Sequence, residues 1–232
     1  MTQLQFPAPA PATLPIRGSA KSYAVARIFC VGRNYADHAA EFGNQVDRDA
    51  PFYFTKCPVH MARSGATVPY PPATANYHHE MEFAVALGTP VFRVAEDAAM
   101  AAVFGYATAL DMTRRDLQAR AKEARKPWDI SKDFEKGAIL GAITPATEFG
   151  KPGPQAISLL LNGEPVQRAH LSDMVWPVPA IIAHLSTLYH LGPGDLILTG
   201  TPAGVGPVRP GDRLVGEVDG LAPVELTVGP QE

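Results

Sequence analysis

Two carboxylates interrupt an otherwise apolar stretch of this chain. Glu80 and Glu82 are two residues apart in the segment Tyr77–Phe83. A strand here would carry both side chains to the same face of a sheet. Two ionised carboxyl groups side by side repel each other, and neither is easily buried without a partner. The segment therefore requires either an exposed strand with two solvated glutamates or a buried site that holds a cation.

A third carboxylate favours the cation site. Asp111 ends a second strand-like run, Gly105–Leu110, about thirty residues further along the chain. Three carboxylates that need no Cys or His beside them suit a hard ion such as Mg2+ or Mn2+ better than Zn2+. The sequence predicts a divalent metal centre formed by Glu80, Glu82 and Asp111.

Composition limits the classes of protein to which the chain can belong. Its 232 residues suit one large domain, and a net charge of −3 provides no basic field for nucleic acid. No apolar run approaches the roughly eighteen residues of a membrane span, and the N-terminus lacks the pattern of a signal peptide. With only Cys30 and Cys57, free thiols are expected. A cytoplasmic protein without nucleic-acid or membrane partners is predicted.

Turn residues and apolar runs indicate how the chain is organised. Prolines in the first fifteen residues predict an irregular N-terminal arm over 1–25, followed by a single domain over 26–232. Residues 68–75 contain three prolines and are expected to form a loop. Strands outnumber helices and do not alternate with them, which argues against a doubly wound sheet. A mixed α/β, β-rich fold with mostly antiparallel strands is predicted, and its peripheral helices are expected at 35–42, 95–103, 112–124 and 178–191.

Five motifs, in order along the chain, resemble the fumarylacetoacetate hydrolase family, and within it the acylpyruvase and fumarylpyruvate hydrolase branch. They are Val31–His38, His78–Glu82, Leu110–Thr113, Lys126–Trp128 with Ser131–Lys132, and Gly194–Gly206. The resemblance implies a β-roll of mixed sheets like the family's C-terminal domain. It also implies a homodimer.

The same resemblance implies an activity. A Mg2+ or Mn2+ ion on the predicted triad would chelate a 2-oxo acid and stabilise the enolate that leaves when a C–C bond breaks. The expected substrates are 3-acylpyruvates, above all fumarylpyruvate, which would give fumarate and pyruvate in gentisate-type aromatic catabolism. Oxaloacetate decarboxylation or dienoate hydration would use the same metal chemistry, and a non-catalytic metal-bound protein is a third possibility.

His38 and Glu41 are the predicted general base and its orienting carboxylate. They are three residues apart, so a helix would place them on one face. An incidental pair on a solvated helix would look the same, and the family resemblance favours the catalytic interpretation. The polar stretch around this helix, about 35–52, is predicted to close over the substrate as a lid.

Other candidate residues would stabilise or bind the substrate. The resemblance implies that Lys132 neutralises the oxyanion on the attacked carbonyl. Arg115 and Arg33 are candidates to bind a substrate carboxylate, although structural salt bridges are the alternative for both. Gln118 would lie on the same helix face as Arg115.

A turn and two histidines complete the predicted site. Backbone N–H groups near Gly200 and the hydroxyl of Thr201 could bind the carboxylate of the 2-oxo acid, unless the turn is only a strand exit. His78 is expected to share the face of the glutamates, and His79 to point away and pack. Lys56 is followed by Cys57 where many relatives have proline, which leaves its role open.

Overall fold

Two large sheets carry the fold, which a computed structural model describes for residues 5–41, 43 and 45–232. Within these residues, the first sheet has eight strands and the second has five. The first contains, in order of pairing, β4 (Phe52–Lys56), β3 (Arg27–Gly32), β15 (Asp195–Leu198), β8 (Met81–Leu87), β9 (Val103–Asp111), β11 (Ala138–Leu140) and β5 (Met61–Arg63), with β12 (Thr144–Pro145) paired to β9. The second contains β14 (Glu164–His170), β13 (Ala156–Leu161), β17 (Arg213–Val218), β18 (Val224–Gln231) and β6 (Ala66–Tyr70).

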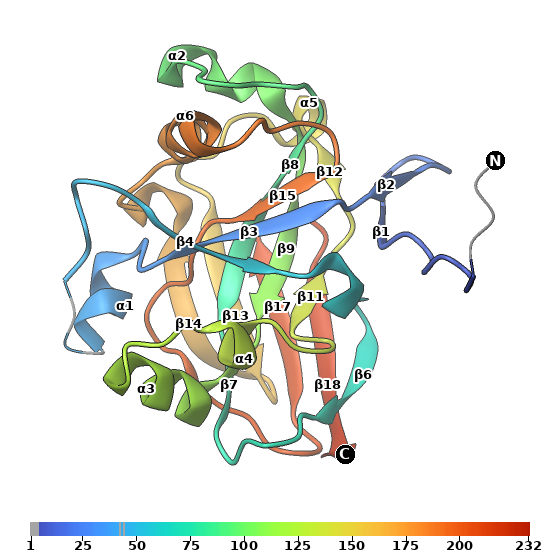
Figure 1. Cartoon of the computed structure of the whole chain (residues 1–232), viewed down its shortest axis with the longest axis vertical. Helices are drawn as coiled ribbons and strands as arrows, with labels where there is room; N and C mark the ends of the chain where they lie inside the picture. The colour runs from blue at the N-terminus through green and yellow to red at the C-terminus, as the bar shows by residue number, and fades with distance from the viewer. Residues whose placement is uncertain (1–4, 42, 44) are drawn as a thin grey trace.

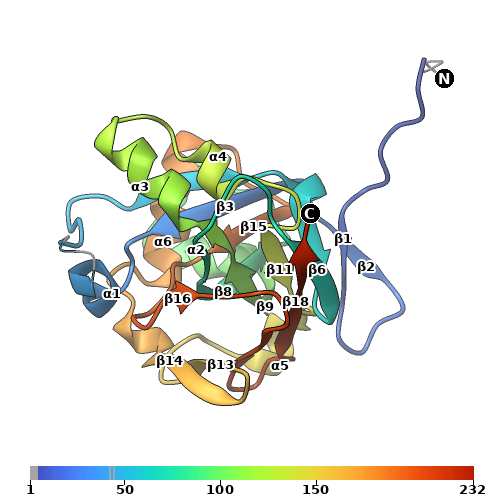
Figure 2. The same ribbon diagram turned by 90° about the horizontal axis from the view of Figure 1, so that it is seen from below.

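Two small sheets and several short helices surround these layers (Figures 1 and 2). The small sheets are β1 (Thr13–Pro15) with β2 (Ser22–Ala24), and β10 (Thr113–Arg114) with β7 (Tyr77–His79) and β16 (Gly206–Pro207). The α-helices are α1 (Ala36–Glu41), α2 (Glu96–Ala99), α3 (Arg115–Glu123), α4 (Asp129–Lys132), α5 (Ala146–Phe149) and α6 (Val178–Leu188). The 3-10 helices are η1 (Pro58–His60), η2 (Met100–Ala102) and η3 (Leu171–Asp173). The predicted β-rich fold with peripheral helices is confirmed.

The central strands β8 and β9 are buried on both faces because they separate two apolar cores. On β8, Phe83 and Val85 face the larger core, whereas Ala84 and Ala86 face the smaller one. Large and small side chains thus alternate along the strand with the period of two that a pleated strand imposes. The buried strand fixes the direction of every side chain on it, including that of Glu82.

Three segments differ from the sequence-based expectation. The segment expected to be a loop after residue 68 contributes to β6, which tolerates Pro69 because β6 lies at the edge of its sheet. The N-terminal arm includes the β1–β2 hairpin, and Leu14 on it is fully buried. The helix expected from residue 112 begins only at Arg115, because Thr113 and Arg114 pair with β7 instead.

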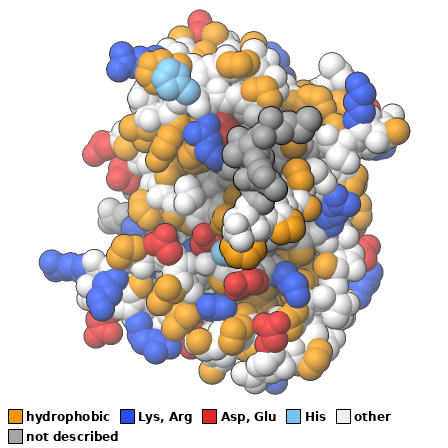
Figure 3. Space-filling view, turned by 45° about the vertical axis from the view of Figure 1, so that its right-hand side comes forward, with side chains coloured by type: hydrophobic (Ala, Val, Ile, Leu, Met, Phe, Trp, Pro, Cys, Tyr) orange, Lys and Arg blue, Asp and Glu red, His pale blue; other side chains and the backbone are white. Residues whose placement is uncertain are grey.

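The surface shown in Figure 3 mixes acidic, basic and apolar side chains without a large field of one sign. This distribution accords with the net charge of −3. None of the helices in the described part of the chain is long and apolar enough to cross a membrane.

Candidate active site

Three neighbouring strands bring the predicted carboxylates together. Glu80 lies between β7 and β8, Glu82 is the second residue of β8, and Asp111 is the last residue of β9. The antiparallel register places Asp111 beside Glu80, whose carbonyl oxygen accepts the Asp111 N–H at 2.9 Å. One carboxylate oxygen from each residue lies within 4.8 Å of the other two, and all three side chains are buried.

Three cations surround two of these carboxylates. Lys132, at the end of α4, donates from Nζ to Glu80 Oε2 at 2.7 Å and to Asp111 Oδ2 at 2.6 Å. Arg115 forms an ion pair with the other oxygen of Glu80, and Lys56 Nζ lies 2.8 Å from Asp111 Oδ1. Burial alone would raise the pKa of Glu80, but Lys132 and Arg115 hold it well below its usual range. Glu80 is therefore ionised, and both carboxylates are paired with cations.

Glu82 is in a different electrostatic environment. Its carboxylate accepts the backbone N–H of Gly200 at 2.8 Å, and no ion pair with it is found in the described residues. Burial, and then the negative charges of Asp111 and Glu80, raise its pKa well above the ordinary value. Three buried carboxylates of which one lacks a cation form a donor set that fits a hard divalent ion such as Mg2+ or Mn2+.

The turn at Gly200 holds Glu82 in place and requires glycine. Gly200 has φ +94°, and a Cβ there would lie 2.8 Å from Asn34 Cβ and 3.1 Å from the Val31 carbonyl oxygen. The Gly200 N–H, which was predicted to bind substrate, is directed at Glu82 in this structure.

We expect Gly200→Ala to lower the free energy of unfolding by more than about 1–2 kcal/mol, because the positive φ and the contact with Asn34 both oppose a Cβ. Gly211→Ala is the matched control, since Gly211 has φ +95° but nothing within 4 Å of an added Cβ. Denaturant unfolding of both variants would measure the difference. Equal losses would show that the close approach to Asn34 contributes nothing.

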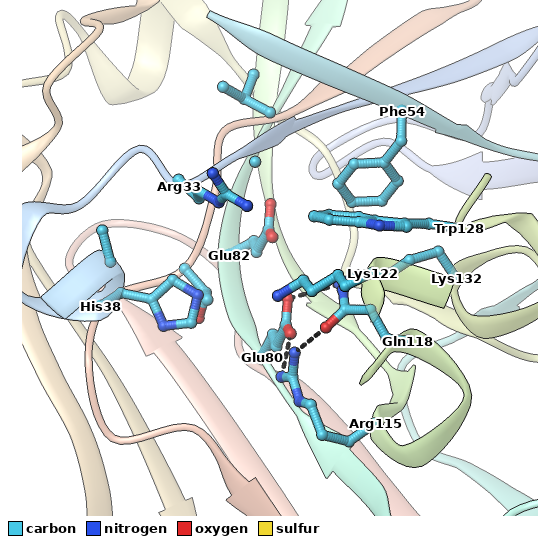
Figure 4. Close-up of a pocket in the computed structure, with 14 residues that line it drawn as sticks. Arg33, His38, Phe54, Glu80, Glu82, Arg115, Gln118, Lys122, Trp128 and Lys132 are labelled. Atoms are coloured by element: carbon cyan, nitrogen blue, oxygen red, sulfur yellow. Dashed lines mark hydrogen bonds and ion pairs between the residues drawn. The ribbon is translucent and has the colours of Figure 1, made fainter. Parts of the chain in front are cut away.

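Glu80 and Glu82 of the triad lie at the floor of a cavity of about 40 Å³. Four of the candidate site residues also line it: His38, Arg33 and Gln118, which Figure 4 labels, and Thr201. Their side chains come from α1, from the turn after β3, from α3 and from the turn after β15. The remaining lining residues are Val31, Gly32, Ala39, Phe54, Glu80, Glu82, Arg115, Lys122, Trp128 and Lys132.

His38 and Glu41 form a pair on α1. His38 Nδ1 lies 3.4 Å from Glu41 Oε2, and the second oxygen of Glu41 accepts the Gly204 N–H at 2.7 Å. A carboxylate near Nδ1 favours the tautomer that carries its proton there and leaves Nε2 as the acceptor. His38 is buried against the cavity and Glu41 is more exposed. Of the predicted lid, Phe42 and Asn44 lie outside the described residues.

Helix α3 supplies the guanidinium and amide groups. Arg115 donates to Gln118 Oε1 at 2.7 Å while it pairs with Glu80, so it is tied to the metal site as well as to the cavity. Thr201 Oγ1 accepts an N–H of Gln167 at 2.8 Å, which leaves its own O–H as a donor.

The two adjacent histidines lie outside the cavity lining. His78, which was expected to face the site, has its Nδ1 3.4 Å from Arg115 Nε and its Nε2 2.8 Å from Asn76 Oδ1. Burial and the nearby Arg115 lower the pKa of His78 to about 4, so it is neutral at pH 7. His79 is buried with its Nδ1 3.2 Å from Gln167 Oε1, which agrees with a packing role.

The sequence left the role of Lys56 open and did not identify Phe54 as a cavity residue, although the spacing of the two residues was informative. Both belong to β4 and are two residues apart, so they point to the same face of that strand. Lys56 is buried, and its Nζ donates to the carbonyl oxygens of Met112 at 3.2 Å and Gly137 at 2.9 Å, and also to that of Lys132. Lys56 thus fixes Asp111 and the end of α4 in place.

Comparison with known proteins supports this description. Residues 27–229 match the family described as fumarylacetoacetate (FAA) hydrolase C-terminal. A fumarylpyruvate hydrolase from Ralstonia sp is 50% identical over 196 residues, which cover 82% of this chain and 100% of the relative. The human mitochondrial oxaloacetate tautomerase FAHD1 is 39% identical over 201 residues, covering 87% of this chain and 90% of the relative.

A solved structure extends the likeness to three dimensions. The crystal structure of fumarylpyruvate hydrolase from Pseudomonas aeruginosa, in complex with Mn2+ and pyruvate, superposes with a TM-score of 0.95 at 41% identity. The match covers 99% of this chain and 100% of that chain. The chain belongs to the fumarylacetoacetate hydrolase family.

Proposed function

We propose that this protein hydrolyses the C–C bond of 3-acylpyruvates, with fumarylpyruvate as the main substrate and fumarate and pyruvate as the products. One observation carries the proposal: Glu80 and Glu82 of the buried carboxylate triad line the same cavity as His38 of the His38–Glu41 pair. The 50% identity to a fumarylpyruvate hydrolase and the likeness to a structure with Mn2+ and pyruvate support this choice of substrate.

Glu80, Glu82 and Asp111 would hold a Mg2+ or Mn2+ ion. When bound, the ion supplies Lewis-acid stabilisation of negative charge on the 2-oxo acid end of the substrate. Arg115, Gln118 and Thr201 would bind and orient that end from the sides of the cavity.

The His38–Glu41 pair would activate water. Glu41 holds the imidazole through Nδ1, and Nε2 takes a proton from a water molecule whose oxygen attacks the acyl carbonyl carbon. Lys132 would place its charge near the carbonyl oxygen as it becomes negative. The C–C bond to the pyruvate methylene then breaks, and its electron pair leaves with the pyruvate fragment, which takes up a proton at that carbon.

An activity on oxaloacetate is the second candidate. Relatives named oxaloacetate tautomerase, including YcgM of Escherichia coli at 37% identity, share the family. Tautomerisation, decarboxylation of oxaloacetate and hydration of a dienoate all differ from hydrolysis in one respect. In none of them does water attack a ketone and cleave the adjacent C–C bond. The His38–Glu41 pair favours the hydrolase without excluding these reactions from the same site.

A substrate comparison tests the proposal. Purified protein with added Mn2+ would be assayed on fumarylpyruvate, acetylpyruvate and oxaloacetate, with pyruvate and the partner acid identified. Fast release of pyruvate with fumarate, at a kcat/KM well above that for oxaloacetate, is expected. Tautomerisation or decarboxylation of oxaloacetate without cleavage of any acylpyruvate would overturn the proposal.

The pH dependence should report His38. Burial lowers its pKa below the ordinary value, and the carboxylates of Glu80 and Glu41 offset that shift only in part. Because the base must be neutral, kcat/KM should fall as pH drops through a midpoint below about 6.5 and should be level between that midpoint and about pH 7. Glu41→Gln removes a charge that raises this pKa and should move the midpoint further down. A midpoint above about 6.5 in the wild-type protein would contradict the assignment of His38 as the general base.

The assembly, location and pathway complete the proposal. We propose a cytoplasmic homodimer that acts in gentisate-type aromatic catabolism, with residues 1–25 as an arm, residues 26–232 as the catalytic domain and the segment 35–52 as a lid. The family resemblance supports the dimer, and the bacterial fumarylpyruvate hydrolases support the pathway. Light scattering after size exclusion would test the dimer.

A further inference from the structure

The outer part of the cavity contains a cation and an aromatic wall that the hydrolytic mechanism does not use. Lys122, on α3, places Nζ 5.0 Å from the centroid of the Trp128 ring. Deeper in the cavity, Lys132 Nζ lies 5.0 Å from the centroid of the Phe54 ring. The two rings are 6.2 Å apart and tilted by 54°. Phe54 and Trp128 thus form a continuous aromatic wall (Figure 4), with the Lys132 ammonium group near one ring and the Lys122 ammonium group near the other.

The cations of the cavity differ in how they are compensated. Lys132 and Arg115, at the floor, contact carboxylates of the triad. Arg33 also lines the cavity, and no described carboxylate lies within 4.0 Å of its guanidinium nitrogens. Arg33 and Lys122 thus add two further positive charges to the lining of the cavity.

The titration of Lys122 agrees with this geometry. Burial is the main reason that its pKa falls to about 8, and the positive charges of Arg115 and Arg33 lower it further. A carboxylate bound between Lys122 and Arg33 would offset both effects, because it would pair with the ammonium group and screen it from the guanidinium groups. The cavity thus favours an anion at its outer end.

The order of groups along the cavity defines a substrate class. From the floor outwards it presents the metal triad, the Lys132 ammonium group, two aromatic faces and a second ammonium group. This order matches a 2-oxo acid, a ketone, a flat conjugated carbon chain and a terminal carboxylate. We propose that Lys122, with Arg33, binds the far carboxylate of the acyl group, an inference that rests on the proposed function. Trp128 and Phe54 would flank the planar double bond of the same group.

The competing interpretation is a purely structural pair in which Lys122 only covers the Trp128 ring. Such a pair would contribute to stability and would not distinguish substrates. The two interpretations therefore differ in substrate preference rather than in stability, and the experiment must compare ligands with and without the terminal carboxylate.

Lys122→Met tests the proposal because methionine keeps an unbranched chain over Trp128 and removes the charge. Loss of one charge-assisted contact should reduce the ratio of kcat/KM for fumarylpyruvate to that for acetylpyruvate by about 10- to 100-fold. Lys122→Arg, which keeps the charge, should restore most of that ratio. Lys126→Met, which removes a charge from an exposed position outside this cavity, is the matched control and should leave it unchanged.

A binding measurement separates this proposal from the proposed function. Fumarate and crotonate differ only in that crotonate has a methyl group in place of one carboxylate. In calorimetry with Mn2+ present, wild-type protein should bind fumarate at least about tenfold more tightly than crotonate, and Lys122→Met should remove that difference. If the protein cleaves no acylpyruvate but still binds fumarate more tightly than crotonate, and Lys122→Met removes that preference, only the proposed hydrolase function would be overturned. An unchanged substrate ratio and an unchanged fumarate preference in Lys122→Met would overturn the carboxylate subsite.

Discussion

Asp111→Asn is expected to weaken Mn2+ binding by more than about 100-fold and to destabilise the metal-free protein by about 3–5 kcal/mol. The first effect follows from the loss of a charged ligand. The second follows because Asp111 lies 2.6 Å from Lys132 Nζ and 2.8 Å from Lys56 Nζ, and all three side chains are buried. Removing the carboxylate charge leaves two buried ammonium groups with less compensation. Calorimetric Mn2+ titration and denaturant unfolding in a chelator would measure the two effects.

Glu82→Gln is the matched comparison for that prediction. It also removes a metal ligand and should weaken Mn2+ binding to a similar degree. Glu82 has a raised pKa and, among the described residues, accepts one hydrogen bond, from the Gly200 N–H at 2.8 Å, so a neutral amide oxygen can take its place. The free energy of unfolding of the metal-free protein should therefore be unchanged or slightly higher. Equal destabilisation by Glu82→Gln and Asp111→Asn would contradict the distribution of charge described for the site.

His38→Ala is expected to lower the rate of pyruvate release by about 10²- to 10⁴-fold, because the water loses its general base. Mn2+ affinity should stay within a few-fold of wild type, since His38 is not among the three metal-binding residues. Single-turnover rates with fumarylpyruvate, together with Mn2+ titration, would check both parts.

His170→Ala is the control for His38→Ala, because His170 lies on the exposed side of β14 and outside the cavity lining. It should retain the wild-type rate. A His38→Ala variant with a wild-type rate would show that another group activates the water, and a loss of Mn2+ binding would place His38 in the metal site instead.

The sequence predicted the triad because local geometry determines most of it. Side chains two apart on a strand share a face, so Glu80 and Glu82 could be paired without knowledge of the fold. His38 and Glu41 are three residues apart on α1, so they too could be paired without knowledge of the fold. Asp111 was harder to place, because its position depends on the antiparallel register of β8 with β9. The family motifs supplied that link.

Long-range contacts explain what the sequence did not reveal. Gly200 was predicted to bind substrate, yet its N–H is directed at Glu82, 118 positions away in the chain. Lys56 reaches Asp111 only because β4 pairs with β3 at the edge of the large sheet. The wall of Phe54 and Trp128 joins β4 to the start of α4, and the linear sequence does not show that these two rings meet. Each of these features depends on which strands are neighbours, which composition and periodicity do not determine.

Metal-dependent hydrolysis of fumarylpyruvate is tested most directly by titrating chelator-stripped protein with Mn2+. The release of pyruvate and fumarate is followed during the titration. The rate should be near zero without metal, rise to a plateau as the site fills, and give pyruvate and fumarate in equal amounts. Asp111→Asn should remain inactive at the same Mn2+ concentrations. A full rate without metal, or pyruvate without an equal amount of fumarate, would contradict the assignment of a metal-dependent acylpyruvate hydrolase.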